Sequence, residues 1–258
     1  MSTDDTSLLA LLRQWAVIWL MGADPSAPER IFTEDYVLHI GAHSFTNRDE
    51  YAQATLGQLH LFNGLMVTVH EVITNGHQAV LRLTEHGAST KHEGRQAAWK
   101  VIALFDGDSA GIATTWAEED YHARKRQLIE GTPDPIEAPI CSPWTTPVLP
   151  PNPGAEDLVR QWIEAGMECP PGVSIDDQDV VGDYQSPLRV TSGQVDFIMS
   201  AGQQVGFHAR LRGAFADDQG IEGTMRAAGL VRVDQAQALQ GHVITDRLGI
   251  RKPKPAGE

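Results

Sequence analysis

The residue types best suited to proton transfer stand at the end of a predicted strand, residues 111–119, where Glu118, Glu119 and Asp120 follow one another. Because side chains alternate faces along a strand, Trp116, Glu118 and Asp120 share one side. A carboxyl group beside an indole at a pocket rim loses water, and this desolvation raises its pKa toward neutrality. Asp120 is therefore a candidate acid or base, and a solvated acidic edge is the alternative interpretation.

Histidine is the second signal, because imidazole exchanges protons near pH 7. His39 and His43 flank the turn after a predicted strand at 36–40. His86 ends another predicted strand, on the face that also carries Arg82. The alternative for each histidine is a half-buried polar residue with one satisfied hydrogen bond.

Other site signatures are weaker. His39 and His43 could bind a metal ion with Glu118 or Asp120 as third ligand. Their spacing, however, brings two ligands together on a helix, whereas these histidines are predicted to lie in a strand and a turn. Residues 107–111 match GxSxG, although the glycines bracket a predicted strand-to-strand turn instead of a strand-to-helix elbow. The sequence contains no GxGxxG, GxxxxGK[ST] or HExxH, so it carries no nucleotide or zinc-protease signature.

Aromatic residues suited to line a pocket are concentrated in the first half of the sequence. That half contains Trp15, Trp19, Tyr36, Trp99 and Trp116, whereas the second half retains Trp162 and Tyr184. Core packing accounts for part of this set. If only one half carries a site, the first half is the expected one.

Composition limits the partners. The chain has 258 residues, with 34 acidic and 20 basic side chains and a net charge of −14. Phosphate backbones and anionic lipids repel such a chain, which argues against binding to nucleic acid or to a membrane surface. The first apolar run, residues 8–21, is too short and too polar to span a bilayer. The acidic start and the two cysteines without a CxxC motif make the cytoplasm the expected location.

The elements that must position these residues fall into two domains. Eight of the fifteen prolines lie in residues 133–153, and proline excludes both regular helix and central strand. We therefore expect a first domain at 1–131, a Pro-rich linker at 132–154 and a second domain at 155–258. In the first domain, helices are predicted at 7–21, 25–32 and 48–59, and strands at 36–40, 66–74, 78–86, 97–105 and 111–119. Helices followed by a meander predict an α+β fold with a concave pocket.

The two halves also resemble each other. Arg13-Gln14-Trp15 reappears as residues 160–162, and NGHQAVLR at 75–82 is echoed by AGQQVGFH at 201–208. Continuing this alignment places Trp116 on His242 and Asp120 on Asp246. Matches in the same order indicate an internal duplication. The second copy is shorter and lacks the segment around residues 47–59.

Five features then carry a family resemblance: the first helix with Trp15, DYVLHIG at 35–41, His86-Gly87, Gly94-Arg95, and GIATTWAEEDYHARKRQL at 111–128. With them, most of residues 7–129 resemble the SnoaL-like branch of the nuclear transport factor 2-like superfamily. This group includes ketosteroid isomerases, polyketide cyclases, scytalone dehydratase and limonene epoxide hydrolase. The resemblance is weaker over 155–250. It implies tandem cone-shaped α+β barrels, with helices packed in a curved antiparallel sheet and a shortened, degenerate second copy.

The resemblance also implies an activity: cofactor-independent acid–base catalysis by a lyase or isomerase. The expected reaction is elimination of water or a small aldehyde, isomerisation or cyclisation of a small hydrophobic, aromatic or polycyclic, hydroxylated substrate. By position Asp120 matches the acid/base of the polyketide cyclases, with His39 and His86 as partners. The residues expected to bind the substrate are Trp15, Trp19, Tyr36, His43, Arg82, Trp99, Trp116 and Glu118. No metal or other cofactor is expected.

Two alternatives stay open. One is epoxide hydrolysis on the same fold, for which Arg82 opposite Glu118 is the candidate pair. The other is a non-catalytic module for small-molecule binding or dimerisation, in which the second copy packs on the first as a pseudo-dimer. The sequence leaves open whether the chain also forms a homo-oligomer.

Overall fold

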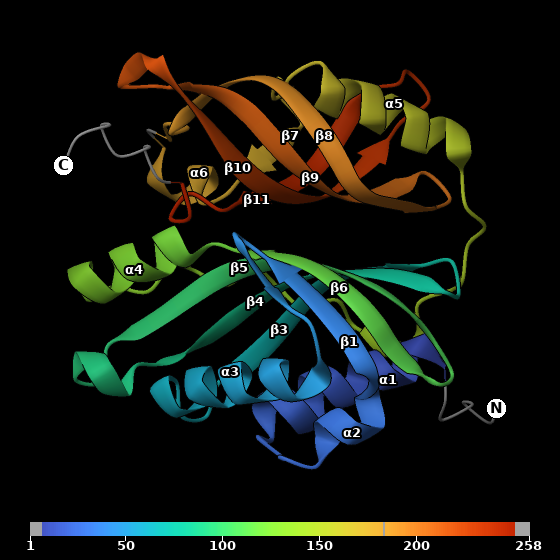
Figure 1. Ribbon diagram of the computed structural model, residues 1–258, viewed down its shortest axis with the longest axis vertical. Helices are drawn as coiled ribbons and strands as arrows, with labels where there is room; N and C mark the ends of the chain where they lie inside the picture. The colour runs from blue at the N-terminus through green and yellow to red at the C-terminus, as the bar shows by residue number, and fades with distance from the viewer. Residues whose placement is uncertain (1–6, 183, 251–258) are drawn as a thin grey trace.

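Two units, each built on a curved sheet, are stacked on one another in the computed structural model, which describes residues 7–182 and 184–250 (Figure 1). The N-terminal unit, blue to green, lies below the C-terminal unit, yellow to red. A long connector passes from one to the other along one side of the molecule. The predicted α+β class with two tandem curved-sheet units is thus confirmed.

The first three helices of the N-terminal unit pack in the hollow of its sheet, whereas the fourth lies at one end of the sheet (Figure 1). They begin where side-chain oxygens accept backbone N–H groups: Ser7 caps the first, Asn47 the third and Asp120 the fourth. The helices are α1 (Leu8–Gln14), which continues as the π-helical η1 (Trp15–Met21), α2 (Ala27–Ile31), α3 (Arg48–Leu61) and α4 (Tyr121–Glu130). A short 3-10 turn, η2 (Thr90–His92), joins two of the strands.

The sheet of this unit has the order β2-β1-β6-β5-β4-β3. Its strands are β1 (Phe32–Ile40), β2 (His43–Phe45), β3 (Met66–Thr74), β4 (Gln78–Ala88), β5 (Gln96–Asp108) and β6 (Gly111–Glu119). β3 to β6 form the predicted antiparallel meander. β1, however, pairs parallel with β6, because the chain leaves β1 through α3 and returns only at the end of the meander. The sheet is therefore mixed rather than purely antiparallel.

The C-terminal unit repeats this topology with fewer helices. Its strand order is β7-β11-β10-β9-β8, and β7 pairs parallel with β11. Its elements are α5 (Pro153–Glu164), β7 (Val173–Ile175), α6 (Gln178–Val181), β8 (Leu188–Ala201), β9 (Gln204–Phe215), β10 (Asp218–Val233) and β11 (Leu239–Thr245). The four-residue α6 stands where the N-terminal unit has α3, as the missing segment predicted.

Strand register supports the internal duplication residue by residue. In the first sheet Leu104 pairs with Val80 on one side and Trp116 on the other. In the second sheet Leu230 pairs with Gly206 and His242. Val80, Leu104 and Trp116 are thus equivalent to Gly206, Leu230 and His242. The two members of each equivalent pair are separated by the same number of residues, and the same separation aligns Asp120 with Asp246.

The two sheets pack face to face through their outer surfaces. Trp116 stacks on Phe197 with ring centroids 4.0 Å apart and an interplanar angle of 13°. The buried residues of this layer are Ile73, Val80, Ile102, Leu104, Met199, Ala201, Ala228, Leu230 and Ile244. The N-terminal sheet is consequently buried on both faces, by its helices on one side and by the second sheet on the other.

Close approach of the sheets depends on a glycine. A Cβ added at Gly206 would lie 2.3 Å from Cγ2 of Val80, the residue that occupies the equivalent position in the other unit. Of these two equivalent residues, Val80 has a branched side chain and Gly206 has none, so the Val80 side chain fills the space beside Gly206.

The Pro-rich connector covers the edge of the first sheet. The Ile140 and Leu149 N–H groups donate to Val69 and Thr74 carbonyls of the edge strand β3, at 2.9 and 3.1 Å. Within it lies a single 3-10 turn, η3 (Pro143–Thr145). Backbone groups that would otherwise be free to pair with another chain are thereby partly satisfied. Among the described residues, no helix has the length and apolar character needed to cross a membrane.

We predict that Gly206→Ala lowers the free energy of unfolding by about 1–3 kcal/mol, because its methyl group would collide with Val80. Chemical denaturation measures this change. The double variant Val80→Ala/Gly206→Ala should lose less stability than the sum of the two single variants. Gly57→Ala is the control, since a Cβ there meets nothing within 4 Å. Additive effects at positions 80 and 206 would contradict the proposed contact.

Candidate functional site

A cavity of about 1090 Å³ lies between the concave face of the N-terminal sheet, the helix α3 and the edge of the C-terminal unit. The first unit supplies most of its wall, and strands β9 and β10 with residues after β11 complete its rim. Its lining includes Trp15, Tyr36, Gly41, His43, Tyr51, Ala54, Gln58, Glu85, Phe105, Glu118, Glu119, Tyr121, Arg212, Glu222, Arg226, Asp246, Leu248 and Gly249.

Two carboxyl groups, Glu85 on β4 and Glu119 on β6, face this cavity from the N-terminal sheet. The Gln58 amide donates to Glu85 Oε2 at 2.9 Å. The Trp99 indole N–H donates to Glu119 Oε2, also at 2.9 Å, and Tyr121 is a further hydrogen-bond partner of Glu119. The amide, indole and phenol thus hold both carboxyl groups against the apolar wall.

The two carboxyl groups differ in how strongly their surroundings favour the protonated form. Burial is the main cause that raises the pKa of Glu85 well above its ordinary value, and repulsion from Glu119 adds to it. Burial also raises the pKa of Glu119, but Arg124 and the hydrogen bonds from Trp99 and Tyr121 oppose the rise. The surroundings therefore favour the protonated form at Glu85 more strongly than at Glu119.

Arg124 supplies positive charge without forming an ion pair with either carboxylate. Its guanidinium carbon lies 4.3 Å from the Tyr121 ring centroid and 5.0 Å from that of Trp99. This stacking holds the cation close to the carboxyl pair. The charge lowers the pKa of both glutamates, against the effect of their burial.

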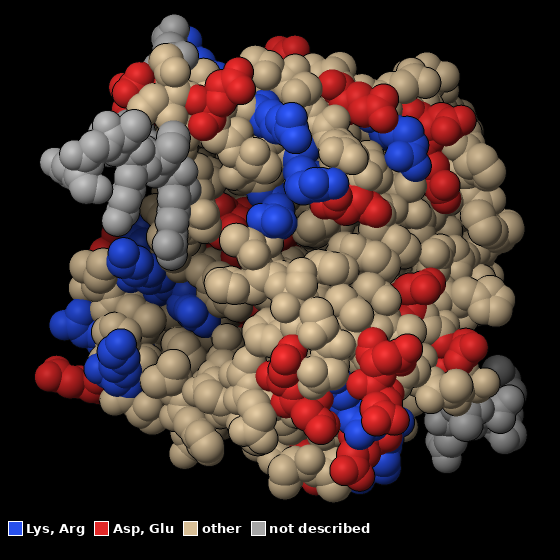
Figure 2. All heavy atoms as spheres, viewed as in Figure 1, with Lys and Arg blue, Asp and Glu red and all other residues tan. Residues whose placement is uncertain are grey.

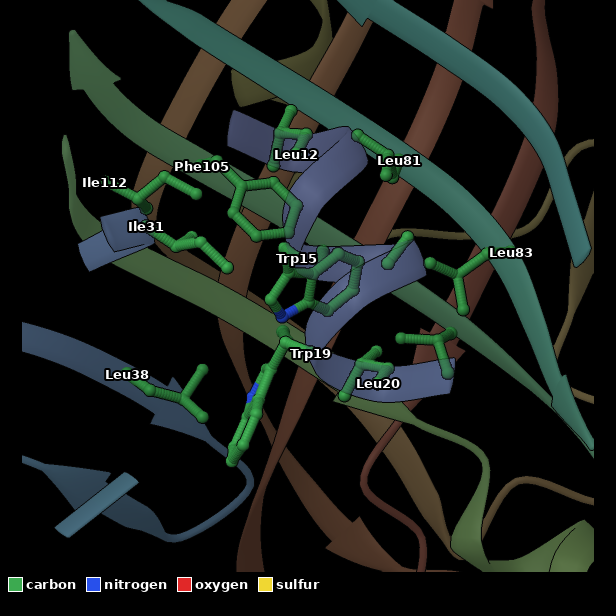
Figure 3. Close-up of a cluster of buried hydrophobic side chains, with 14 of the residues drawn as sticks. Leu12, Trp15, Trp19, Leu20, Ile31, Leu38, Leu81, Leu83, Phe105 and Ile112 are labelled. Atoms are coloured by element: carbon green, nitrogen blue, oxygen red, sulfur yellow. The ribbon is translucent and has the colours of Figure 1, made fainter. Parts of the chain in front are cut away.

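A polarised phenol also lines the cavity. The Tyr51 oxygen accepts the indole N–H of Trp15 at 3.0 Å and that of Trp19 at 3.3 Å. Figure 3 shows the two indoles in the buried cluster, on the helix that crosses the sheet. Burial raises the pKa of Tyr51 to about 12, so the phenol stays protonated. Its O–H, strengthened as a donor by the two indoles, can hydrogen-bond a ligand oxygen.

A second buried network joins the two units at the rim. His208 of β9 is 2% exposed and lies 3.1 Å from Glu118 Oε1 and 3.2 Å from Asp196 Oδ2. The Gly41 N–H also donates to Glu118. Although burial opposes it, the two carboxylates raise the pKa of His208. Burial raises the pKa of Glu118, and the hydrogen bond from His208 opposes that rise, so the rim carries a buried carboxyl–imidazole pair that joins the two units.

The structure brings part of the predicted substrate-binding set together. Trp15, Tyr36, His43 and Glu118 line the cavity. Trp19 and Trp99 are fully buried behind it and act through hydrogen bonds to Tyr51 and Glu119.

The structure places Asp120 outside the cavity lining, on the opposite face of the sheet from Glu119. It caps α4 by accepting the Ala123 N–H at 3.0 Å and pairs with Arg247 at 2.7 Å. The reasoning about alternation correctly grouped Asp120 with Trp116, but that face meets the C-terminal sheet. The neighbouring Glu119 lines the cavity instead, and Asp120 has a structural role.

Four other predicted residues lie away from the cavity lining. His39 lies 2.8 Å from Ser44 Oγ and stacks on Trp116, which itself packs on Phe197. His86 lies 3.1 Å from Thr68 Oγ1. Arg82 pairs with Glu71 and with Glu137 of the connector, not with Glu118. The pair expected for epoxide hydrolysis is therefore not assembled.

The weaker signatures also have structural explanations. Within residues 7–182 and 184–250, no three His, Cys, Asp or Glu side chains are grouped as metal ligands. Glu118 and Asp120, the predicted third ligands, are occupied by His208 and Arg247. The GxSxG match at 107–111 forms the β5–β6 hairpin turn, as its neighbours indicated.

Sequence reasoning missed Glu85, Glu119, Tyr51 and Gln58. A signal for Glu85 was present: it follows Leu81 and Leu83 at every second position, so it lies on the apolar face of β4. The signal was ambiguous because Val80 and Ile102, on the other face, are equally buried. When both faces of a sheet are covered, alternation groups residues without telling which group meets the cavity.

Arg247 is the centre of a buried ionic cluster between the units. Its guanidinium contacts Asp120 at 2.7 Å, Asp177 at 2.8 Å and Asp176 at 3.2 Å. Asp176 also accepts hydrogen bonds from Tyr184 and from the backbone and hydroxyl of Thr245. Burial, with repulsion from Asp120, raises the pKa of Asp176 to about 7.

Residues 13–122 match the family described as SnoaL-like domain. The comparison with curated proteins gives no match. Among solved structures, a Jannaschia sp. CCS1 protein, provisionally assigned as a SnoaL-like polyketide cyclase, is 13% identical, with TM-score 0.45; the match covers 50% of this chain and 95% of that one. An epoxide hydrolase from M. tuberculosis, described as LEH-like, is 14% identical, with TM-score 0.41, covering 48% and 86%. Similarity this distant does not indicate a shared reaction.

We predict that protonation of Asp176 stabilises the fold. Its pKa of about 7 in the folded protein lies above the ordinary 3.8, so its contribution to stability is fully present below the lower value and is lost as pH rises through the higher one. Chemical denaturation between pH 4 and pH 8 should show wild-type stability falling relative to Asp176→Asn as pH rises. Parallel curves for the two proteins would contradict the assignment.

Proposed function

Because residues 13–122 form a SnoaL-like domain, we propose that the chain is a cofactor-independent enzyme that transfers a proton on a small hydrophobic substrate. The observation that carries this proposal is the pair Glu85 and Glu119. Two carboxyl groups of different proton affinity face one cavity with an apolar wall, and such a pair can act as acid and base in the same reaction.

In the proposed step, the Glu119 carboxylate removes a proton from a carbon next to a carbonyl group. The electron pair of the broken C–H bond moves toward the carbonyl oxygen, which gains negative charge. The Glu85 carboxylic acid and the Tyr51 phenol donate hydrogen bonds to that oxygen. Return of the proton from Glu119 to another carbon gives isomerisation. Transfer of that proton to a hydroxyl group on the next carbon, which then leaves as water, gives elimination. Attack of the enolate carbon on a second carbonyl carbon gives ring closure, and the alkoxide that forms takes up the proton.

The cavity wall favours an aromatic or polycyclic substrate. Trp15, Tyr36 and Phe105 line it with aromatic rings, and their apolar surfaces exclude water from the carboxyl pair. Exclusion of water strengthens each of the hydrogen bonds that stabilise developing charge. The reaction class proposed is that of a lyase or isomerase.

A non-catalytic binding module is the less favoured alternative for the first unit, because ionisable groups do line its cavity. The second unit fits a structural role better. Its concave face is filled by its own core, in which Val159 and Ile163 of α5 pack against Phe207 and Leu211. The second unit thus covers the outer face of the first sheet and completes the rim of the cavity.

We predict that Glu119→Gln lowers catalysed proton exchange by about 10²–10⁴-fold, because the base is removed while the side-chain shape is retained. The readout is exchange of the α-hydrogens of 2-tetralone, an apolar bicyclic ketone, in D₂O by NMR. The matched control is Glu34→Gln, which removes an exposed carboxylate of the same unit outside the cavity lining and should leave the rate within about twofold. An equal loss in both variants, or no catalysed exchange by the wild-type protein, would overturn the proposal.

The pH profile of this exchange should show which group holds the proton. The rate should fall as pH rises through the raised pKa of Glu85, because a second carboxylate repels the enolate and no longer donates a hydrogen bond. Glu85→Gln keeps a neutral donor at that position, so the fall on the alkaline side should disappear after correction for uncatalysed exchange. Persistence of the same alkaline limb in the variant would show that another group causes it.

A further inference from the structure

The arginines that face the boundary between the two units fall into two groups. Four of them contact carboxylates: Arg82, Arg126, Arg210 and Arg247. The other two, Arg212 on β9 and Arg226 on β10, line the cavity. Within the described ranges 7–182 and 184–250, neither guanidinium has a carboxylate within 4.0 Å. Arg212 is exposed and Arg226 is half-buried, so both guanidinium groups are accessible to a molecule in the cavity.

Strand register places these two arginines on one face. Arg212 pairs with Thr224, and Arg210 pairs with Arg226. Arg212 and Arg226 are therefore diagonal neighbours on adjacent strands, a relation in which Cα atoms lie about 7–8 Å apart and long side chains can meet. Two guanidinium groups so placed can converge on one anionic group.

The acidic residues of the same rim differ in the partners that they already have. Glu118 is paired with His208 at 3.1 Å. Asp246 accepts the Gly249 N–H at 2.7 Å, which holds its carboxylate toward the segment after β11. Glu222, which is exposed on the same strand as Arg226, is the acid that competes most directly for the two arginines.

Figure 2 shows a group of Lys and Arg side chains over the strands of the C-terminal sheet, near the boundary with the lower unit. The opposite wall of the cavity carries Glu85 and Glu119. An anionic group would be repelled by the Glu119 carboxylate and attracted to the arginine rim. The charge distribution therefore gives a bound molecule a direction, with its anionic end toward β9 and β10.

We propose that Arg212 and Arg226 form a subsite for an anionic group such as a carboxylate, and that the substrates are amphipathic anions with an apolar ring system. This inference depends on the proposed function only in that the cavity holds the substrate. It assigns the second unit a binding role: its own concave face is filled, yet its strands supply the selectivity of the first unit's site.

A pair of fluorescent probes tests the subsite without any catalytic step. Anilinonaphthalene sulfonate and N-phenylnaphthylamine share an apolar skeleton, but only the first carries an anion. Arg212→Met and Arg226→Met should each weaken binding of the sulfonate by about tenfold and leave binding of the neutral probe within about twofold. Glu222→Gln should tighten binding of the sulfonate, because it removes the competing charge.

Two controls fix the location of the effect. Arg232→Met changes an exposed arginine of the same strand that does not line the cavity, and it should alter neither probe's affinity. Ala54→Trp places a large side chain in the cavity from α3 and should abolish binding of both probes. The proposal is overturned if the sulfonate still binds to Ala54→Trp, if the arginine variants weaken both probes equally, or if they weaken neither. None of these outcomes depends on proton transfer by Glu119.

Discussion

Packing of two sheets through their outer faces is the constraint on which the site depends. It buries Val80, Leu104 and Trp116 against the second unit and so commits the other face of the first sheet to the cavity. That choice of face decides that Glu119 lines the cavity while Asp120, one residue later, caps α4 and binds Arg247. The same packing places β9 and β10 beside the cavity, so that residues far apart in the sequence complete one rim.

The sequence predicts the architecture well because the residues that end helices and strands act locally. The Asn-Gly turn at 75–76 and the prolines of 133–153 each act on their immediate neighbours. The helix α4, which Asp120 caps, was not predicted. The predicted strands at 66–74 and 111–119 coincide with β3 and β6. The parallel pairing of β1 with β6 was missed, since it depends on how distant segments meet rather than on any local signal.

The site is only partly predictable for a related reason. Trp15, Tyr36, His43 and Glu118 were identified as residues that bind the substrate, and all four line the cavity. Glu119 was passed over in favour of Asp120, because alternation gives the relative orientation of side chains and not the side on which the second unit packs. Arg212 and Arg226 carry no local mark of function; their importance appears only when the ion pairs of the other interface arginines are known.

The connector along β3 has a consequence for assembly. Because it joins the units covalently and occupies part of the edge strand, the contact between the sheets is intramolecular and its formation does not depend on protein concentration. A homodimer built on the same surfaces would separate on dilution and would repeat every substitution in both copies. In this chain each unit can change independently, so one unit has a valine where the other has a glycine. The second unit can therefore change toward packing and selectivity while the first unit keeps the cavity.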